Sequence, residues 1–283
     1  MRNWTASNWD VRRALAEIAG SRGAGGSSDP RAHPFAARMP LSIARALVEK
    51  LSRPGALVLD PLVGSGTTVL AARELGRIGV GFDIDPLAVM LSRASAAAVD
   101  PEALRLAHAR VLGRAERRSK AVRDRLVDTM GPAEDEFLDY WFPRRAQREL
   151  AALAEAIRAE KDRMTMNVLW VVFSSLVVAK SSGASYALDL AHTRPHRDLK
   201  KEIAWPFEAW EPRFERFVAA LSSRPGVPRL GTAAICRGDT RHLPLREDSV
   251  DLILTSPPYL RSHPCLRGTC GGLSLDHLIS PTQ

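Results

Sequence analysis

The segment from Gly55 to Ala98 constrains the fold of this chain more than any other. It begins with "GALVLD", a short apolar run typical of a strand that is buried on both faces of a parallel sheet. A glycine-rich turn, "PLVGSG", leads into a helical pattern that ends at Gly76. "RIGVGFDID" then repeats the strand signal ahead of a second helix, which Pro86 opens. Strand, turn, helix, strand and helix within about 45 residues form a βαβα unit, whose right-handed crossover makes the strands parallel.

The rest of the chain surrounds this unit with a helical segment and a second strand pattern. Helical periodicity marks 101–127, 144–162 and 165–180, and the first of these carries eight Lys or Arg between Arg105 and Arg125. The strand pattern returns in "TAAICRGD" and "VDLILTSPPY". We therefore expect an α/β sheet interrupted by a basic helical insertion. The expected parts are an arm with a Gly/Ser-rich linker (1–32), a first sheet half (33–99), the insertion (100–230), a second sheet half (231–260) and an irregular tail (261–283).

The glycine turn and two acids suggest a nucleoside ligand. Gly64 and Gly66 remove side chains where backbone meets a ligand, and the helix behind them offers free N–H groups. Asp83 ends the second strand, the position from which a carboxylate accepts both ribose hydroxyls; Asp85 is the alternative, or else caps the next helix. Asp239 ends the third strand and either accepts a hydrogen bond from an adenine amine or simply starts a turn. No lysine follows Gly66 and the third glycine of GxGxxG is missing, so S-adenosylmethionine (SAM) fits better than NAD or ATP.

The motif Ser256-Pro257-Pro258-Tyr259 ends the last strand with an unusually stiff aromatic tip. Prolines have no N–H and a fixed φ, so their carbonyl groups can be aimed outward. The Ser256 hydroxyl and the Pro257 carbonyl can then accept two hydrogen bonds from a planar exocyclic amine, while Tyr259 stacks on the base. Alone, the four residues also fit an ordinary strand end with a surface tyrosine. Beside the glycine turn and the acids, they favour a base-binding tip at the carboxyl edge of the sheet.

Together these motifs resemble the SAM-dependent amino-group DNA methyltransferases, which have a Rossmann-like fold. "DPLVGSGTT" is similar to the family's DPFxGSGTT, with Leu62 in place of the usual aromatic residue, and "SPPY" is similar to its (D/N/S)PP(Y/F) motif. "HPFAARMP" and "GD…LP" resemble the segments ahead of each. The resemblance implies that Ser256, Pro257, Pro258 and Tyr259 are catalytic. It also implies that the cofactor is held by His33, Pro34, Phe35, Asp60, Pro61, Gly64, Ser65, Gly66, Thr67, Thr68, Asp83 and Asp239.

The same resemblance suggests a substrate. In the family, serine at the position of Ser256 goes mostly with methylation of cytosine N4, and aspartate mostly with adenine N6. We therefore expect site-specific methylation of double-stranded DNA, with cytosine N4 favoured, in a restriction–modification setting. Adenine N6 in DNA and guanine N2 in RNA are the enzymatic alternatives, and a non-catalytic remnant that binds SAM or DNA is the other. The insertion would be the target-recognition region, with phosphate contacts from Arg194, Arg197, Lys200 and Lys201, although these side chains also fit a solvated surface.

The chain departs from the family after the catalytic motif. Family members place three more strands there, whereas only 23 residues follow Leu260 and they contain no convincing strand. We expect a sheet of about four strands with an exposed edge or apolar face. Either a second polypeptide completes the sheet, or the chain is truncated or frame-altered at its C-terminus.

Composition adds weaker expectations. The net charge is +8, which is compatible with a polyanionic partner. The three cysteines lack metal-ligand spacing, so no metal site is expected. No signal peptide or membrane-spanning run is evident, and we expect a cytoplasmic protein with no membrane partner.

Overall fold

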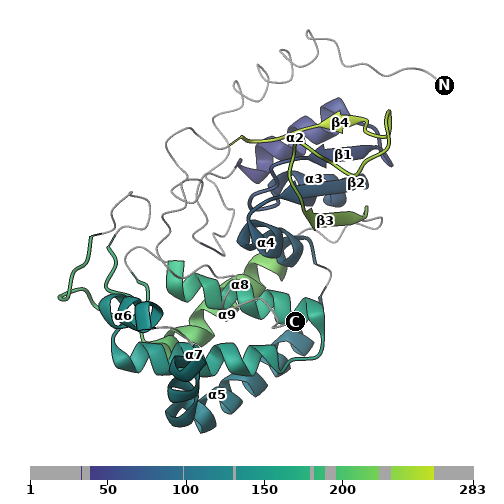
Figure 1. The fold of residues 1–283 in the computed structure, drawn as a ribbon. Helices are drawn as coiled ribbons and strands as arrows, with labels where there is room; N and C mark the ends of the chain where they lie inside the picture. The colour runs from purple at the N-terminus through teal and green to yellow at the C-terminus, as the bar shows by residue number, and fades with distance from the viewer. Residues whose placement is uncertain are drawn as a thin grey trace. The chain divides into compact units, whose positions relative to one another are not determined.

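The computed structural model divides the chain into two compact units, one built around a sheet and one made of helices (Figure 1). The sheet unit contains residues 39–97 and 231–257, and the helical unit contains residues between 99 and 222 together with His33. The residues that the structure describes are 33, 39–97, 99–129, 132–178, 182–188, 196–222 and 231–257, with backbone alone for 120–129 and 178.

The sheet has four parallel strands in the order β3-β2-β1-β4 within the described residues. They are β1 (Leu57–Asp60), β2 (Ile78–Asp83), β3 (Ala233–Arg237) and β4 (Leu252–Ile253). β1 lies between β2 and β4, with Leu59 in register with Val80 on one side and Ile253 on the other. The predicted parallel α/β sheet, with one half supplied from each side of the helical insertion, is confirmed.

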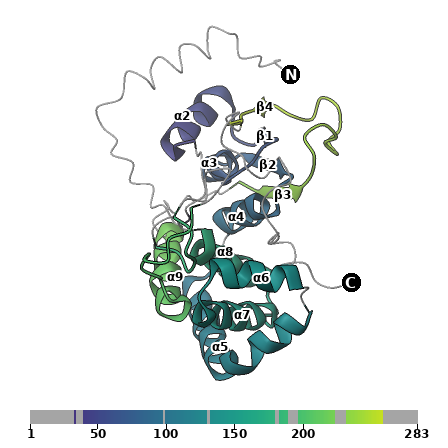
Figure 2. The ribbon, with the colours of Figure 1, turned by 60° about the vertical axis from the view of Figure 1, so that its left-hand side comes forward.

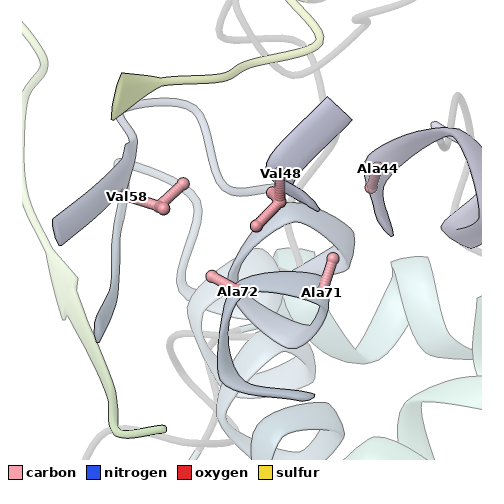
Figure 3. Close-up of a cluster of buried hydrophobic side chains, with 5 residues drawn as sticks. All are labelled: Ala44, Val48, Val58, Ala71 and Ala72. Atoms are coloured by element: carbon pink, nitrogen blue, oxygen red, sulfur yellow. The ribbon is translucent and has the colours of Figure 1, made fainter. Parts of the chain in front are cut away.

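Three helices cover one face of this sheet: α2 (Leu41–Leu51), α3 (Thr67–Glu74) and α4 (Pro86–Ala96). Figure 3 shows small side chains from α2, β1 and α3 meeting in the core; these are Ala44, Val48, Val58, Ala71 and Ala72. Gly79 and Gly81 on β2 permit close packing in a second core cluster that contains Val63 and Val69, because a Cβ at Gly81 would lie 2.5 Å from the side chain of Val63.

The opposite face of the sheet carries two exposed apolar side chains. Side chains alternate along a strand, so Ile78 and Ile253 point away from the three helices. They are 41% and 62% exposed. β4 pairs with β1 over only two residues, although the N–H of Leu254 still donates to the carbonyl of Leu59 (3.0 Å). Leu59 and Phe82 on the same face are buried, so an uncovered apolar face stays a prediction.

Five helices make up the described part of the helical unit (Figures 1 and 2). They are α5 (Pro101–Thr129), α6 (Pro132–Trp141), α7 (Arg144–Arg158), α8 (Arg163–Val178) and α9 (Pro206–Ser222). The buried core is rich in aromatic rings, with Phe173, Trp210 and Phe214 at most 1% exposed. α8, the most apolar of the five, has 16 residues, and no helix in the described ranges is long and apolar enough to cross a bilayer.

Candidate functional site at the carboxyl edge of the sheet

The carboxyl ends of β1 and β4 bring two predicted motifs to neighbouring positions. β1 is the strand at which the order of the sheet reverses, because β2 lies on one side of it and β4 on the other. Ligands of open parallel sheets bind beyond the carboxyl ends of the strands at such a switch point. The glycine turn follows β1 directly, and Ser256 and Pro257 follow β4 after two residues. Ser256 is half-buried and Pro257 is exposed.

The glycine turn has a backbone shape that requires glycine. Gly64 and Gly66 have φ of 49° and 84°, and a Cβ at Gly66 would lie 2.9 Å from the Cα of Ser92. The Ser92 hydroxyl donates to the Gly64 carbonyl (2.8 Å), which ties the turn to α4. Gly66 is the N-cap of α3, so no side chain caps its first turn. The first turn of this helix also contains no acidic residue.

Asp83 is fixed at the end of β2 by two backbone amides. Its Oδ2 accepts the N–H of Gly64 (2.9 Å) and its Oδ1 accepts the N–H of Asp85 (3.0 Å). Each carboxylate oxygen can accept a further hydrogen bond, so the group can still bind a hydroxyl. Asp85 instead accepts the N–H of Leu87 (2.9 Å) and caps α4, which is the structural role that the sequence offered for it.

Asp60 is a buried carboxyl group at the end of β1, only 4% exposed. Burial raises its pKa to about 6, and the nearby Asp83 carboxylate acts in the same direction. The hydroxyls of Thr255 and Thr68 and the N–H of Leu62 oppose this rise in the pKa. The Thr255 hydroxyl lies near Asp60 without the geometry of a full hydrogen bond. Asp60 therefore lies between the first turn of α3 and the residue that precedes Ser256.

Asp239 is engaged by a neighbouring cation. Both carboxylate oxygens accept hydrogen bonds from the Arg241 guanidinium at distances from 2.5 to 3.0 Å, and Oδ1 also accepts the N–H of Arg241. Arg241 lowers the pKa of Asp239 to about 2. This geometry supports the turn role that the sequence left open, and contact with an adenine amine stays a prediction.

The other predicted site residues divide between the two units. Pro61 and the Ser65–Thr68 segment lie in or directly after the turn, with Asp60, Gly64 and Asp83. His33 belongs to the helical unit, where its Nε2 is 2.9 Å from the hydroxyl of Ser174 on α8. Its contact with a cofactor stays a prediction. Pro34, Phe35, Pro258, Tyr259 and Arg194 lie outside the described residues.

The basic residues of the helical unit have different surroundings. Arg197 and Lys200 are exposed, whereas Lys201 donates from Nζ to the carbonyl of Ala187 (2.6 Å), and burial lowers its pKa. Sequence reasoning missed Tyr140 and Tyr186, whose rings lie 4.2 and 5.5 Å from the Arg197 guanidinium. No sequence signal links these tyrosines to Arg197, because they come from separate segments.

Four arginines of the basic helix α5 are paired with glutamates. Arg110 and Arg114 both bind Glu160 (3.0 and 2.9 Å). In the same way, Arg105 pairs with Glu215 and Glu102, and Arg118 pairs with Glu155. These four arginines are already paired, so the composition of α5 overstates its free positive charge.

Comparison with known proteins gives matches to only part of the chain. Residues 4–93 match the N6/N4 family model described as "DNA methylase". Among curated proteins, the chain is 43% identical over 47 residues to Type II methyltransferase M.HindIII of Haemophilus influenzae (17% of this chain and 15% of that protein). It is 41% identical over 69 residues to M.MjaI of Methanocaldococcus jannaschii (24% and 22%) and 40% identical over 74 residues to M.ScaI of Streptomyces caespitosus (25% and 24%).

The matched segments thus span less than a third of the length of each of these relatives. No solved structure gives a significant match. The family match includes the glycine turn and Asp83, and it ends before the Ser-Pro-Pro-Tyr motif. Through this segment, the chain is similar to the N6/N4 amino-group DNA methyltransferases.

Proposed function

We propose that this chain transfers a methyl group from SAM to the exocyclic amine of a DNA base, with cytosine N4 favoured. One observation carries the proposal. The glycine turn after β1 and the Ser256-Pro257 segment after β4 follow adjacent parallel strands at the switch point of the sheet. A ligand-binding turn and a base-binding tip can therefore serve one crevice.

The residues of the turn suit SAM. The Asp83 carboxylate, held by two backbone amides, would accept ribose hydroxyls. The first turn of α3, which has no side-chain cap, would face the carboxylate of the methionine part. Pro61, Ser65, Thr67 and Thr68 would line the same turn. When bound, SAM supplies a methyl group on a positively charged sulfur.

The tip would act on the base by orientation. The Ser256 hydroxyl and the Pro257 carbonyl would accept hydrogen bonds from the target amine, and Tyr259 would stack on the ring. Those bonds direct the lone pair of the amine nitrogen away from the tip. The amine loses one proton for each methyl group that it gains; Ser256 and Pro257 orient the amine through hydrogen bonds, and the proton passes to water.

Ser256 also supports the choice of base. A neutral hydroxyl stands here where adenine-specific relatives mostly have an acid, so cytosine N4 is favoured over adenine N6. Guanine N2 of RNA is the remaining substrate, and a chain that binds SAM or DNA without turnover is the non-catalytic outcome.

A second polypeptide that completes the sheet is a further part of the proposal. It is supported by the exposure of Ile253 on β4 and of Ile78 on the same face. Purification of the chain from its native cells, followed by mass spectrometry of proteins retained at high salt, tests this part. Co-purification of one stoichiometric protein that is lost in Ile253→Asp is expected, and recovery of the chain alone contradicts it.

Methyl transfer itself can be measured with isotopically labelled SAM and mixed DNA, followed by mass spectrometry of the nucleosides. We expect labelled N4-methylcytosine, and no label with Tyr259→Ala. Labelled N6-methyladenine would overturn the cytosine assignment, and labelled methylguanosine in an RNA sample would replace the substrate class. The absence of transfer by a chain that binds SAM would leave the non-catalytic reading.

A further inference from the structure

Two short segments of the helical unit pair in an antiparallel arrangement next to α6. Ala187 and Arg197 form an antiparallel bridge, and the N–H of Leu188 donates to the carbonyl of His196 (3.0 Å). The N–H of Tyr186 donates to the carbonyl of Trp141 at the end of α6 (2.8 Å). Residues 186–188 and 196–198 are therefore fixed to the helical unit by backbone hydrogen bonds.

This pairing places Arg197 between two tyrosine rings. Its guanidinium carbon lies 4.2 Å from the ring centroid of Tyr140 and 5.5 Å from that of Tyr186. Stacking on aromatic faces restricts a guanidinium without using its N–H donors. We call these three residues the arginine clamp. Arg197 is exposed and Tyr140 is 49% exposed, so the clamp is open to solvent.

The clamp lies in a segment with excess positive charge. Residues 196–201 contain three cations (Arg197, Lys200 and Lys201) and one acid (Asp198), a formal charge of 3 − 1 = +2 with His196 neutral. The Asp198 carboxylate accepts the backbone N–H of Lys200 (2.8 Å) and so shapes the turn. Within the described residues, no carboxylate forms an ion pair with Arg197 or Lys200. The arginines of α5 contrast with this, because Arg105, Arg110, Arg114 and Arg118 are paired with glutamates.

We propose that the arginine clamp is a nucleic-acid backbone contact, in which Tyr140 and Tyr186 hold the Arg197 guanidinium ready to bind a phosphate, with Lys200 beside it. This inference rests on the proposed function for the identity of the polyanion, DNA. Lys201 is excluded from the contact, because its ammonium group already donates a hydrogen bond to the carbonyl of Ala187. Arg105, Arg110, Arg114 and Arg118 of α5 are excluded because their charges are already compensated by glutamates.

Phosphate contact fits the geometry better than base stacking does. Tyr140 already has Arg197 over its ring and the edge of Trp141 against it at a centroid distance of 4.9 Å. The guanidinium keeps five N–H donors in a planar arrangement that matches phosphate oxygens. The clamp therefore presents a cation on an aromatic support, and its contribution to binding should be independent of sequence.

The test is fluorescence anisotropy of the purified full chain with a labelled DNA duplex of mixed sequence, over a series of salt concentrations. Loss of one phosphate contact in Arg197→Ala should weaken binding roughly 3- to 10-fold and reduce the slope of log K against log salt by about 1. Tyr140→Ala keeps the positive charge of Arg197 but removes one of the rings that restrict its guanidinium. Affinity should therefore fall roughly 2- to 5-fold, while the slope stays unchanged. Tyr140→Phe keeps the aromatic ring and should bind DNA as the wild type does.

Arg118→Ala is the matched control, because it removes an exposed arginine of the same unit that is paired with Glu155 (3.1 Å). It should leave both affinity and slope unchanged. Equal effects of Arg197→Ala and Arg118→Ala, or a wild-type chain that does not bind the duplex, would overturn the proposal. SAM binding by calorimetry separates the two ideas. If SAM binding fails while the clamp variants behave as expected, the proposed function falls and the contact stands; the reverse result rejects the contact alone.

Discussion

The two units hold their charged groups in opposite ways. In the sheet unit, Asp83 accepts hydrogen bonds from backbone amides, and Asp60 is buried with a raised pKa and another acid nearby. In the helical unit, four arginines of α5 pair with glutamates, as Arg110 and Arg114 do with Glu160 in the connection between α7 and α8. A carboxylate that is fixed by backbone N–H groups can still accept hydrogen bonds from a ligand. A charged side chain that is already paired with another side chain mainly contributes to the structure of its unit.

The exceptions in each unit support this difference. Asp239 in the sheet unit is an acid with its own cation, and its geometry is that of a turn rather than of a free acceptor. Arg197 in the helical unit is a cation held by aromatic rings instead of an acid. The contacts of a charged side chain therefore indicate its role better than its presence in the sequence does.

The largest expected effect comes from removing the acid that the backbone fixes. Asp83→Ala should weaken SAM binding by about 100-fold or more, because hydrogen bonds to a charged group contribute about 1.5–3 kcal/mol each and two ribose hydroxyls would lose theirs. Asp85→Ala is the control and should cost about 1 kcal/mol of stability through loss of the α4 cap, with little change in SAM affinity. Calorimetry reports both affinities, and a larger loss in Asp85→Ala would reverse the assignment.

A backbone substitution tests whether the glycine turn is as rigid as its geometry indicates. Gly66→Ala combines a φ of 84° with a contact of 2.9 Å to Ser92, so it should destabilise the chain by about 3 kcal/mol. Gly55→Ala has a similar φ of 80° but nothing within 4 Å, and should cost about 1 kcal/mol. Urea unfolding measures the difference. Equal losses would show that the close approach to Ser92 is not restrictive.

The pH dependence of stability tests the buried acid. The pKa of Asp60 is about 6 in the folded chain, compared with 3.8 for an ordinary aspartate, so the folded chain keeps this proton to a higher pH than the unfolded chain does. Its contribution to the free energy of unfolding is therefore most favourable below about pH 4 and falls by roughly 2–3 kcal/mol as the pH rises through about 6. Asp60→Asn should remove that fall and be more stable than wild type at pH 7. An unchanged pH profile in the variant would contradict this account of Asp60.

The smallest effect is expected from the paired arginines. Arg118→Ala removes an ion pair in which the side chains are 68% and 36% exposed, and should change the free energy of unfolding by less than about 0.5 kcal/mol. Thermal or urea unfolding checks this value. A loss well above 1 kcal/mol would mean that the α5 pairs are major determinants of stability in the helical unit.

The sheet unit was largely predictable because its signals are local. Short, mostly apolar runs predicted β1 and β2, which have four and six residues. The glycines between these runs predicted the turn, and the end of the second run predicted the position of Asp83. Ligands of parallel sheets bind beyond the carboxyl ends of the strands, which predicted that the motifs after β1 and β4 lie at the same edge of the sheet. β4 was harder, because only Leu252 and Ile253 pair before the Ser-Pro-Pro motif ends the strand.

The helical unit was predicted as helices but not as a surface. Periodicity found α5, α7 and α8, yet it missed α6, a ten-residue helix that begins at Pro132, and α9, which begins at Pro206. It could not show that Glu160 compensates two arginines of α5, or that Lys201 is used internally. The arginine clamp joins α6 to residues 186 and 197, and such contacts between distant segments leave no periodic trace in a single sequence.

The most direct test of the central claim is whether the purified chain binds SAM at the carboxyl edge of its sheet. Isothermal titration of SAM, with NAD and ATP as comparison ligands, answers this without requiring catalysis. We predict saturable binding of one SAM per chain, lost in Asp83→Ala and kept in Arg197→Ala, with no binding of NAD or ATP. A chain that gives no heat with SAM, or that binds all three ligands alike, would contradict the account.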